Sequence, residues 1–227
     1  MNAYWCIPPK ENADFVAHME DVLDIYEMPY NPALPVICMD EKPYQLLGHC
    51  LDPLPVRPGD FQKTDSEYMR KGTCSIFIFT ELLAGWRHAS VRTQRRAVDW
   101  AEEMKYLLTQ CYPKAEKLVL DNLNTHVIGS LCKRFPASEA RSYVRRLESH
   151  YTPKHGSWLN ITEIELNVMT RQCLARRLAD SSIVSTELAS WEAARNKETN
   201  RVIWHFTSDN VRNKLASLYP KFDSDTE

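Results

Sequence analysis

The sequence predicts an α/β fold built on a mixed sheet, and three observations support this prediction. Short apolar runs of strand length recur at 36–39, 74–79 and 117–120. Stretches with apolar residues at three- and four-residue steps, the spacing of amphipathic helices, lie before, between and after these runs. The order of several strands, one helix and a further strand favours a parallel crossover, so the sheet should contain both parallel and antiparallel pairs.

The first forty residues are expected to form one helix and one buried strand. Residues 4–9 are predicted to be extended, and 11–26 to be a helix with one apolar face. Three prolines break the chain before the apolar run 36–39, which has the composition of a buried strand. This strand should end on Asp40 and Glu41.

The next segment is expected to contain a hairpin, a loop and a second hairpin. A strand at 44–49 should pair back on the preceding one, and 51–71, rich in proline and polar residues, should be a long surface loop. The strongest strand signal is 74–79, where β-branched and aromatic residues dominate. Residues 86–91 are its expected antiparallel partner.

The second half alternates helices with two short strands. A helix at 96–111 should end before Pro113, and the buried strand 117–120 is followed by Asp121. The acidic tail 223–227 should be frayed. The remaining expected elements are helices at 128–135, 138–146, 159–178, 186–197 and 208–218, a strand at 147–151 and a loop at 152–157.

Composition excludes several classes of protein. The 227 residues, with a formal charge of -2, fit one soluble domain or one domain with an appendage, and contain neither a membrane-length apolar run nor a signal-peptide pattern. The seven cysteines form no CxxC pair, which disfavours a disulfide framework and a zinc site. The six glycines are never two apart, so GxGxxG and P-loop motifs are excluded, and HExxH and GxSxG are absent.

The near-neutral charge hides an asymmetry. Residues 1–67 hold four basic against twelve acidic side chains, whereas 133–177 hold nine basic against four acidic ones. The split is compatible with a basic surface for a polyanion beside an acidic region that holds metal. Solvated helix faces are the alternative, and are favoured on composition alone.

Two carboxylates after buried strands suggest a metal site. If the strands before Asp40 and Asp121 are neighbours, the two side chains meet and repel unless a divalent cation neutralises them. Glu163 or Glu165 on the following helix would add a third oxygen ligand suited to Mg²⁺ or Mn²⁺. Two such ions, about 3.5–4 Å apart, activate the attacking and leaving oxygens of a phosphodiester. Capping of turns is the commoner role of such aspartates.

Three segments of the chain carry a specific resemblance. They are VICMDEKP at 36–43, LVLDNLNTH at 118–126 and HYTPKHGSWLNITEIE at 150–165. They resemble the three catalytic motifs of the bacterial insertion-sequence 630 transposases, relatives of the mariner elements in the DDE transposase and integrase superfamily. The resemblance extends from residue 4 to about residue 219.

The resemblance implies an RNase H-like fold: a five-stranded mixed sheet flanked by helices, with extra C-terminal helices. The implied division is an N-terminal extended segment and helix at 1–30, a catalytic core at 31–182, and C-terminal helices with an acidic tail at 183–227. It also implies that two Mg²⁺ or Mn²⁺ ions cleave element-end DNA, and that the freed 3′-hydroxyl attacks target DNA, typically at TA.

Matching positions give the implied catalytic and metal-binding residues as Asp40, Asp121 and Glu163. Glu165 is a rival third carboxylate, but Glu163 keeps the motif's offset from Asn160. The supporting residues are expected to contact metal-bound water or the scissile phosphate, or else loop backbone; they are Glu41, Asn122, Asn124, His126 and Asn160.

Other side chains are candidates for contact with DNA. Lys154 and His155 are expected to contact phosphates, with a solvated turn as the alternative. Trp158 could stack on a flipped base, although a core position is more common. A basic DNA-facing cluster is also expected, formed by Arg141, Arg145 and Arg146.

Members of the family carry a helix-turn-helix region ahead of the catalytic domain, and here 39 residues precede Asp40. The chain is therefore predicted to be a catalytic fragment, one product of a split frame, or a decayed copy. Its expected partners are element-end and target DNA and a second copy in a synaptic complex, and a separate helix-turn-helix DNA-binding part is either missing or encoded elsewhere. It is expected in the bacterial cytoplasm with the nucleoid. The alternatives are an RNase H-like nuclease without strand transfer and a truncated DNA-binding or inhibitory partner of a full-length transposase.

Overall fold

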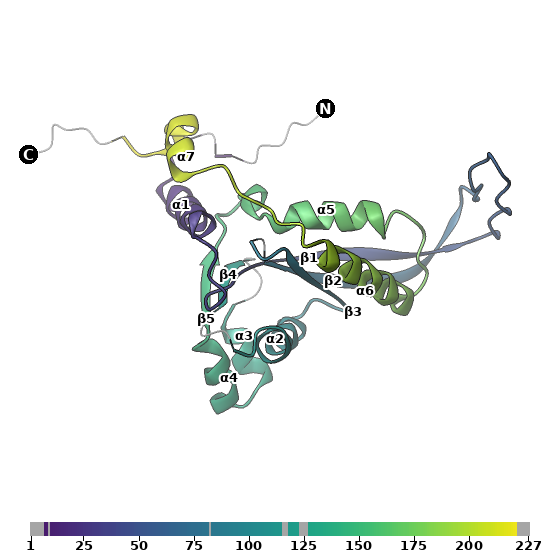
Figure 1. Ribbon diagram of the computed structural model, residues 1–227, viewed down its shortest axis with the longest axis horizontal. Helices are drawn as coiled ribbons and strands as arrows, with labels where there is room; N and C mark the ends of the chain where they lie inside the picture. Colours follow the sequence, from purple (N-terminus) through teal and green to yellow (C-terminus); the bar gives the residue numbers. More distant parts are fainter. Residues whose placement is uncertain (1–6, 9, 82, 115–117, 123–126, 222–227) are drawn as a thin grey trace, which may run out of the picture.

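The computed structural model describes residues 7–8, 10–81, 83–114, 118–122 and 127–221. A sheet with the strand order β3-β2-β1-β4-β5 runs through the molecule, with helices on both faces (Figure 1). β1, β2 and β3 are antiparallel, whereas β4 is parallel to β1 and β5 is parallel to β4. The strands are β1 Val36–His49, β2 Tyr68–Glu81, β3 Trp86–Arg92, β4 Leu118–Asn122 and β5 Leu147–Tyr151. The predicted α/β class and mixed sheet are confirmed.

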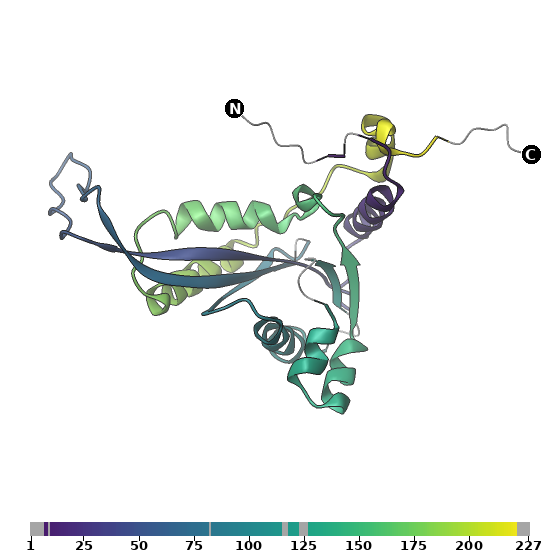
Figure 2. The same ribbon diagram turned by 180° about the vertical axis from the view of Figure 1, so that it is seen from behind.

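The hairpin predicted between 36–39 and 44–49 is wrong. Both segments belong to one 14-residue strand, β1, which pairs with β2 from Ile37 to His49. The outer halves of β1 and β2 extend from the sheet as a two-stranded ribbon, which Figures 1 and 2 show from opposite sides. Asp40 therefore lies inside a strand and does not end one.

The ribbon also shortens the predicted loop 51–71, because β2 begins at Tyr68. The first six residues of β2 are exposed, so they lack the buried alternation that marks a strand in sequence. Pro43 lies inside β1 although proline has no N–H to donate to a neighbouring strand. On the β4 side, however, β1 is paired only at Val36–Cys38. Pro43 thus lies where β1 has one neighbouring strand, a position that tolerates a missing N–H.

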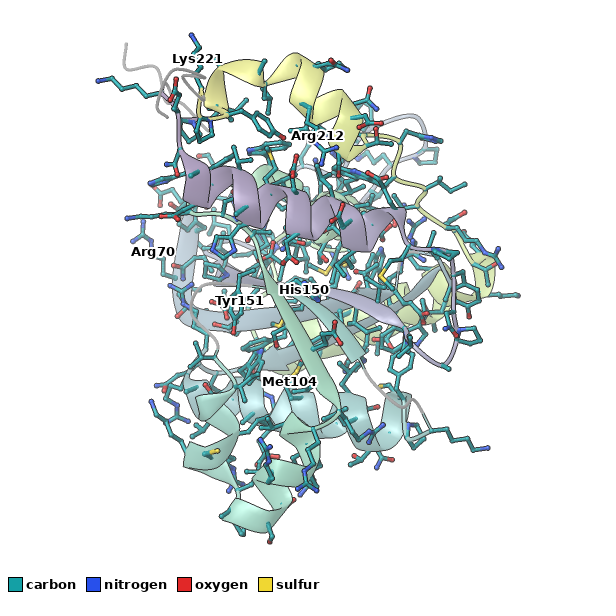
Figure 3. All side chains as sticks on the ribbon, turned by 90° about the vertical axis from the view of Figure 1, so that its left-hand side faces the viewer. Arg70, Met104, His150, Tyr151, Arg212 and Lys221 are labelled. Carbon is teal, nitrogen blue, oxygen red and sulfur yellow. The ribbon has the colours of Figure 1, made fainter. Side chains whose placement is uncertain are left out.

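Helices cover the two faces of the sheet in two groups (Figure 1). One group is α2 Ala97–Tyr106, extended by a π-helical turn Leu107–Cys111, with α3 Gly129–Arg134 and α4 Ala137–Val144. The other is α1 Ala13–Glu27, α5 Thr162–Gln172, α6 Ser181–Glu198 and α7 Ser208–Lys214. Figure 3 shows α1 and α7 above the sheet and the group that contains Met104 below it.

Alternation along β1 decides which way Asp40 points. Ile37 and Met39 pack into the core beneath α2, whereas Cys38 packs into the core beneath α1. Because successive side chains project to opposite faces, Asp40 shares the face of Cys38. That face is the one that α1 and α5 cover.

The predicted helix 159–178 is shorter in the structure. A 3₁₀ turn, Ser157–Leu159, precedes α5, and α5 ends at Gln172. The residues after it run beside β1, where Tyr44 donates to the carbonyl of Arg176 at 3.1 Å and the Leu47 amide donates to the carbonyl of Leu178 at 2.9 Å. These tertiary hydrogen bonds replace the helical ones. None of the helices in the described ranges is long and apolar enough to span a membrane.

Candidate active site

Asp40 is a nearly buried carboxylate in the middle of β1. Its residue exposure is 9%, and its Oδ1 accepts a hydrogen bond from the Glu41 amide at 2.7 Å. Its pKa is raised to about 6, mainly by burial; the negative charges of Glu163 and Glu41 act in the same direction, and the hydrogen bond and the Lys42 charge oppose them. A bound divalent cation would remove this unfavourable arrangement of charge.

Glu163 faces Asp40 from the first turn of α5. It is exposed, and it lines the same open groove as Asp40. Burial raises the pKa of its carboxyl, and a hydrogen bond from the Ser157 side chain acts in the opposite direction. The structure therefore brings together the first and third carboxylates of the predicted set.

Asn160 fixes the distance between the two elements that carry these carboxylates. Its Nδ2 donates to the carbonyl of Met39 at 2.9 Å, and its Oδ1 accepts from the Thr162 amide at 3.0 Å. One side chain thus ties the residue before Asp40 to the start of α5. Its contacts are with backbone, one of the two alternatives left open for it.

Glu165, the rival third carboxylate, lies in a different environment. It is 1% exposed and accepts hydrogen bonds from Arg87 at 2.8 Å and Arg195 at 3.0 Å. Burial would raise its pKa, but the hydrogen bonds and charges of the two arginines outweigh burial and hold the pKa below its ordinary value. Two arginines already neutralise this carboxylate, which favours Glu163 as the metal ligand.

Sequence reasoning missed the pair formed by Arg87 and Glu165. Arg87 is fully buried and also donates to the carbonyls of Gly85 and Asn200. The available signal was an arginine inside a strand of apolar character, since such a charge needs a buried partner.

Asp121 is placed by the backbone of β4. It pairs in register with Cys38 on one side and with His150 on the other. Asp40 is two residues beyond Cys38, so the strands of the two aspartates are neighbours, which was the condition for a shared site. The side chains of Asp121 and Asn122 lie outside the described part of the molecule, as do Asn124 and His126.

Two predicted site residues are used within the fold. The Glu41 carboxylate pairs with Arg95 at 3.1 Å. Arg146 donates to the carbonyls of Leu108 and Tyr112, at 3.0 and 2.6 Å, and so caps the end of the α2 extension. Arg146 therefore has a structural function that its sequence position does not reveal.

The other predicted DNA contacts lie away from the carboxylates or at the molecular surface. Arg141 and Arg145 are exposed, on α4 and at its end, and α4 covers the face opposite α5. Lys154 and His155 are exposed in the loop between β5 and the 3₁₀ turn. Trp158 packs partly buried against the core beneath α1, which supports its core interpretation.

The groove beside the carboxylates is formed by β1 and α5. It encloses about 400 Å³, within the usual range of ~300–1,000 Å³ for ligand sites. Its lining residues are Asp40, Glu41, Lys42, Pro43, Glu163, Leu166, Asn167 and Thr170. Carboxylate oxygens at one end fit a hard cation such as Mg²⁺ or Mn²⁺.

Comparisons with known proteins identify the family and the fold. The family model of the DDE superfamily endonucleases matches residues 35–184, so the chain belongs to that family. The prediction of an enzyme that cuts phosphodiesters is thereby confirmed, as is the superfamily. No curated protein matches the sequence.

Solved structures of the mariner transposase Mos1 share the fold. The paired-end complex with Mn superposes with a TM-score of 0.57 at 14% identity, over 98% of this chain and 68% of that one. The pre-cleavage transpososome gives a TM-score of 0.59 at 16% identity, over 98% and 68%. The strand transfer complex gives 0.58 at 16%, over 98% and 67%.

Proposed function

We propose that this chain is the catalytic domain of a transposase with an RNase H-like fold. In this proposal Asp40, Asp121 and Glu163 bind two Mg²⁺ or Mn²⁺ ions, cleavage of element-end DNA frees a 3′-hydroxyl, and that hydroxyl attacks target DNA. The observation that supports this proposal most strongly is that Asp40 and Glu163 line the same groove. Both lie inside the segment matched by the endonuclease family.

The residues that are present fit the metal ions. Burial is the first cause of the raised pKa of Asp40, and the charge of Glu163 is a further one; the nearby Lys42 charge lowers the pKa but does not offset them. The ions would supply Lewis acidity at the scissile phosphate. Asn160 would hold Glu163 at its distance from β1, and Ser157 would orient the Glu163 carboxylate.

The proposal extends to partners and to domain boundaries. The catalytic core would occupy 31–182, between the N-terminal helix segment 1–30 and the C-terminal helices at 183–227. The solved relatives are described as paired-end and strand-transfer complexes, which supports DNA ends and a second copy as partners. A helix-turn-helix part would read the element ends. The specific family would be that of insertion sequence 630.

A joining assay tests the proposal. The element ends are identified as inverted repeats beside TA duplications around the reading frame. A labelled linear end is then incubated with target plasmid and Mg²⁺ or Mn²⁺, with and without an added helix-turn-helix DNA-binding part. Joined product supports the transposase, and cleavage without joining supports a nuclease. Binding without either reaction supports a non-catalytic partner.

A further inference from the structure

Lys42 and Asn167 lie beside the carboxylates but have no assigned function. Lys42 follows Asp40 by two residues on β1, and Asn167 follows Glu163 by four residues on α5. These are the repeat distances of a strand face and a helix face, so each residue shares the face of the carboxylate before it. All four side chains line the groove.

The Lys42 charge lowers the pKa of Asp40, but in the described part of the chain no ion pair or side-chain hydrogen bond fixes Lys42 or Asn167. The nearby Arg95, in contrast, is paired with Glu41. Lys42 is only partly exposed, so a cation is held at the groove with its three donors available to a ligand.

Lys42 and Asn167 lie at similar distances along the groove from the carboxylates that precede them. At about 3.3 Å per strand residue, Lys42 lies ~7 Å beyond Asp40, and at 1.5 Å per helix residue Asn167 lies ~6 Å beyond Glu163. Both steps are comparable to the span of one nucleotide in a DNA strand. An ammonium and an amide N–H₂ are both donors to phosphate oxygens.

We propose that Lys42 and Asn167 bind the phosphate adjacent to the scissile one and so set the register of the cleaved strand. This inference rests on the proposed function, because it takes the scissile phosphate to lie at the carboxylates. The two ends of the groove would then differ in function. Metal ions would bind at the end with Asp40 and Glu163, and the DNA strand would bind at the end with Lys42 and Asn167.

The test compares Lys42→Gln, Lys42→Arg and Asn167→Ala with a matched control, Lys197→Gln, which alters an exposed lysine on α6. Affinity for a short labelled duplex is measured by anisotropy against salt, with Ca²⁺ present to prevent cleavage. Loss of one phosphate contact should reduce the slope of log K against log salt by about 0.9 in Lys42→Gln. Lys42→Arg and Lys197→Gln should keep the wild-type slope.

Asn167→Ala should weaken binding about tenfold with little change of slope, since it loses a neutral donor to a charged group. In Mn²⁺-dependent nicking of plasmid, Lys42→Gln should raise KM more than it lowers kcat. Thermal melts should show that Lys42→Gln still folds cooperatively, because its side chain makes no ion pair or side-chain hydrogen bond with the described residues.

The outcomes separate the two proposals. A wild-type slope and KM in Lys42→Gln, from a protein that nicks DNA normally, would overturn the phosphate contact and leave the proposed function standing. A wild-type protein that neither binds nor nicks DNA, even with the DNA-binding part added, would overturn both. A slope reduced equally in Lys197→Gln would show a diffuse charge effect and also overturn the contact.

Discussion

Replacing Asp40 by asparagine should stabilise the metal-free protein at neutral pH. Folding raises the pKa of this carboxyl from 3.8 to about 6, with burial as the main cause. At 1.36 kcal/mol per pKa unit, the ionised carboxylate costs the fold about 3 kcal/mol above pH ~6. Asparagine has nearly the same shape and carries no charge, so it should remove this cost.

The sign of the pH dependence follows from linkage. Below the unfolded pKa the carboxyl is protonated in both states and contributes nothing. Between 3.8 and about 6 the unfolded state loses its proton first, so wild-type stability falls as pH rises through this window. The advantage of Asp40→Asn should therefore be near zero below about pH 3 and complete above about pH 7.

Urea unfolding in EDTA at several pH values measures this advantage for wild type and variant. Mn²⁺ should then stabilise the wild type, by about 2.7 kcal/mol at a hundredfold excess over Kd, and not the variant. An Asp40→Asn protein that is less stable than wild type at pH 7 without metal would refute the reasoning. So would an advantage that does not change with pH.

Glu165→Gln is the matched control, a second buried carboxylate whose pKa is shifted the other way. Removing its charge leaves Arg87 and Arg195 without their partner, so the variant should lose about 3–5 kcal/mol of stability at neutral pH. If it still folds, it should keep its Mn²⁺-dependent stabilisation. Loss of that stabilisation alone would assign Glu165 to the metal site.

Three further predictions concern activity, positioning and charge. Asp121→Asn should abolish Mn²⁺-dependent nicking and leave the circular dichroism spectrum intact; undiminished nicking would remove Asp121 from the site. Asn160→Ala should cost about 1–3 kcal/mol in urea unfolding, because the Met39 carbonyl loses its side-chain donor, and should lower kcat more than it raises KM; equal nicking constants would leave Asn160 a purely structural residue. DNA affinity should fall steeply with salt concentration. Replacing Arg141 and Arg145 by glutamine should reduce the slope of log K against log salt by about 0.9 per arginine. An unchanged slope would show that these arginines belong to a solvated helix face.

Local patterns in the sequence predicted the core of the fold well. The pair β2 and β3 was found because the inner half of β2 is a continuously buried run of β-branched and aromatic residues, and burial alternates along the start of β3. The parallel crossover into β4 followed from the order of the elements, and the structure adds that β1 is the neighbour of β4. These features depend on residues close together in sequence.

The ribbon could not be predicted in the same way. Its β2 half is exposed, and its stability comes from pairing with a strand many residues earlier. Asp40, Glu41 and Pro43 resemble a strand end when read locally. Only the register with β2 shows that the strand continues through them.

For the site, the sequence supplied the candidate carboxylates, and the structure separates their environments. Spacing could not distinguish Glu163 from Glu165, because the two differ in the neighbours that they meet. Arg87 and Arg195, which pair with Glu165, come from distant segments, β3 and α6. Arg146 likewise donates its hydrogen bonds to carbonyls at the end of the α2 extension. Such long-range pairs are fixed by packing and leave no local pattern.

Titration of Mn²⁺ into wild type, Glu163→Gln and Asp40→Asn, followed by calorimetry, tests the central claim most directly. The claim is that Asp40 and Glu163 share a metal site at the groove between β1 and α5. Wild type should bind Mn²⁺ and release protons near pH 6, and each variant should lose at least about tenfold in affinity. Wild-type affinity in Glu163→Gln would contradict the account.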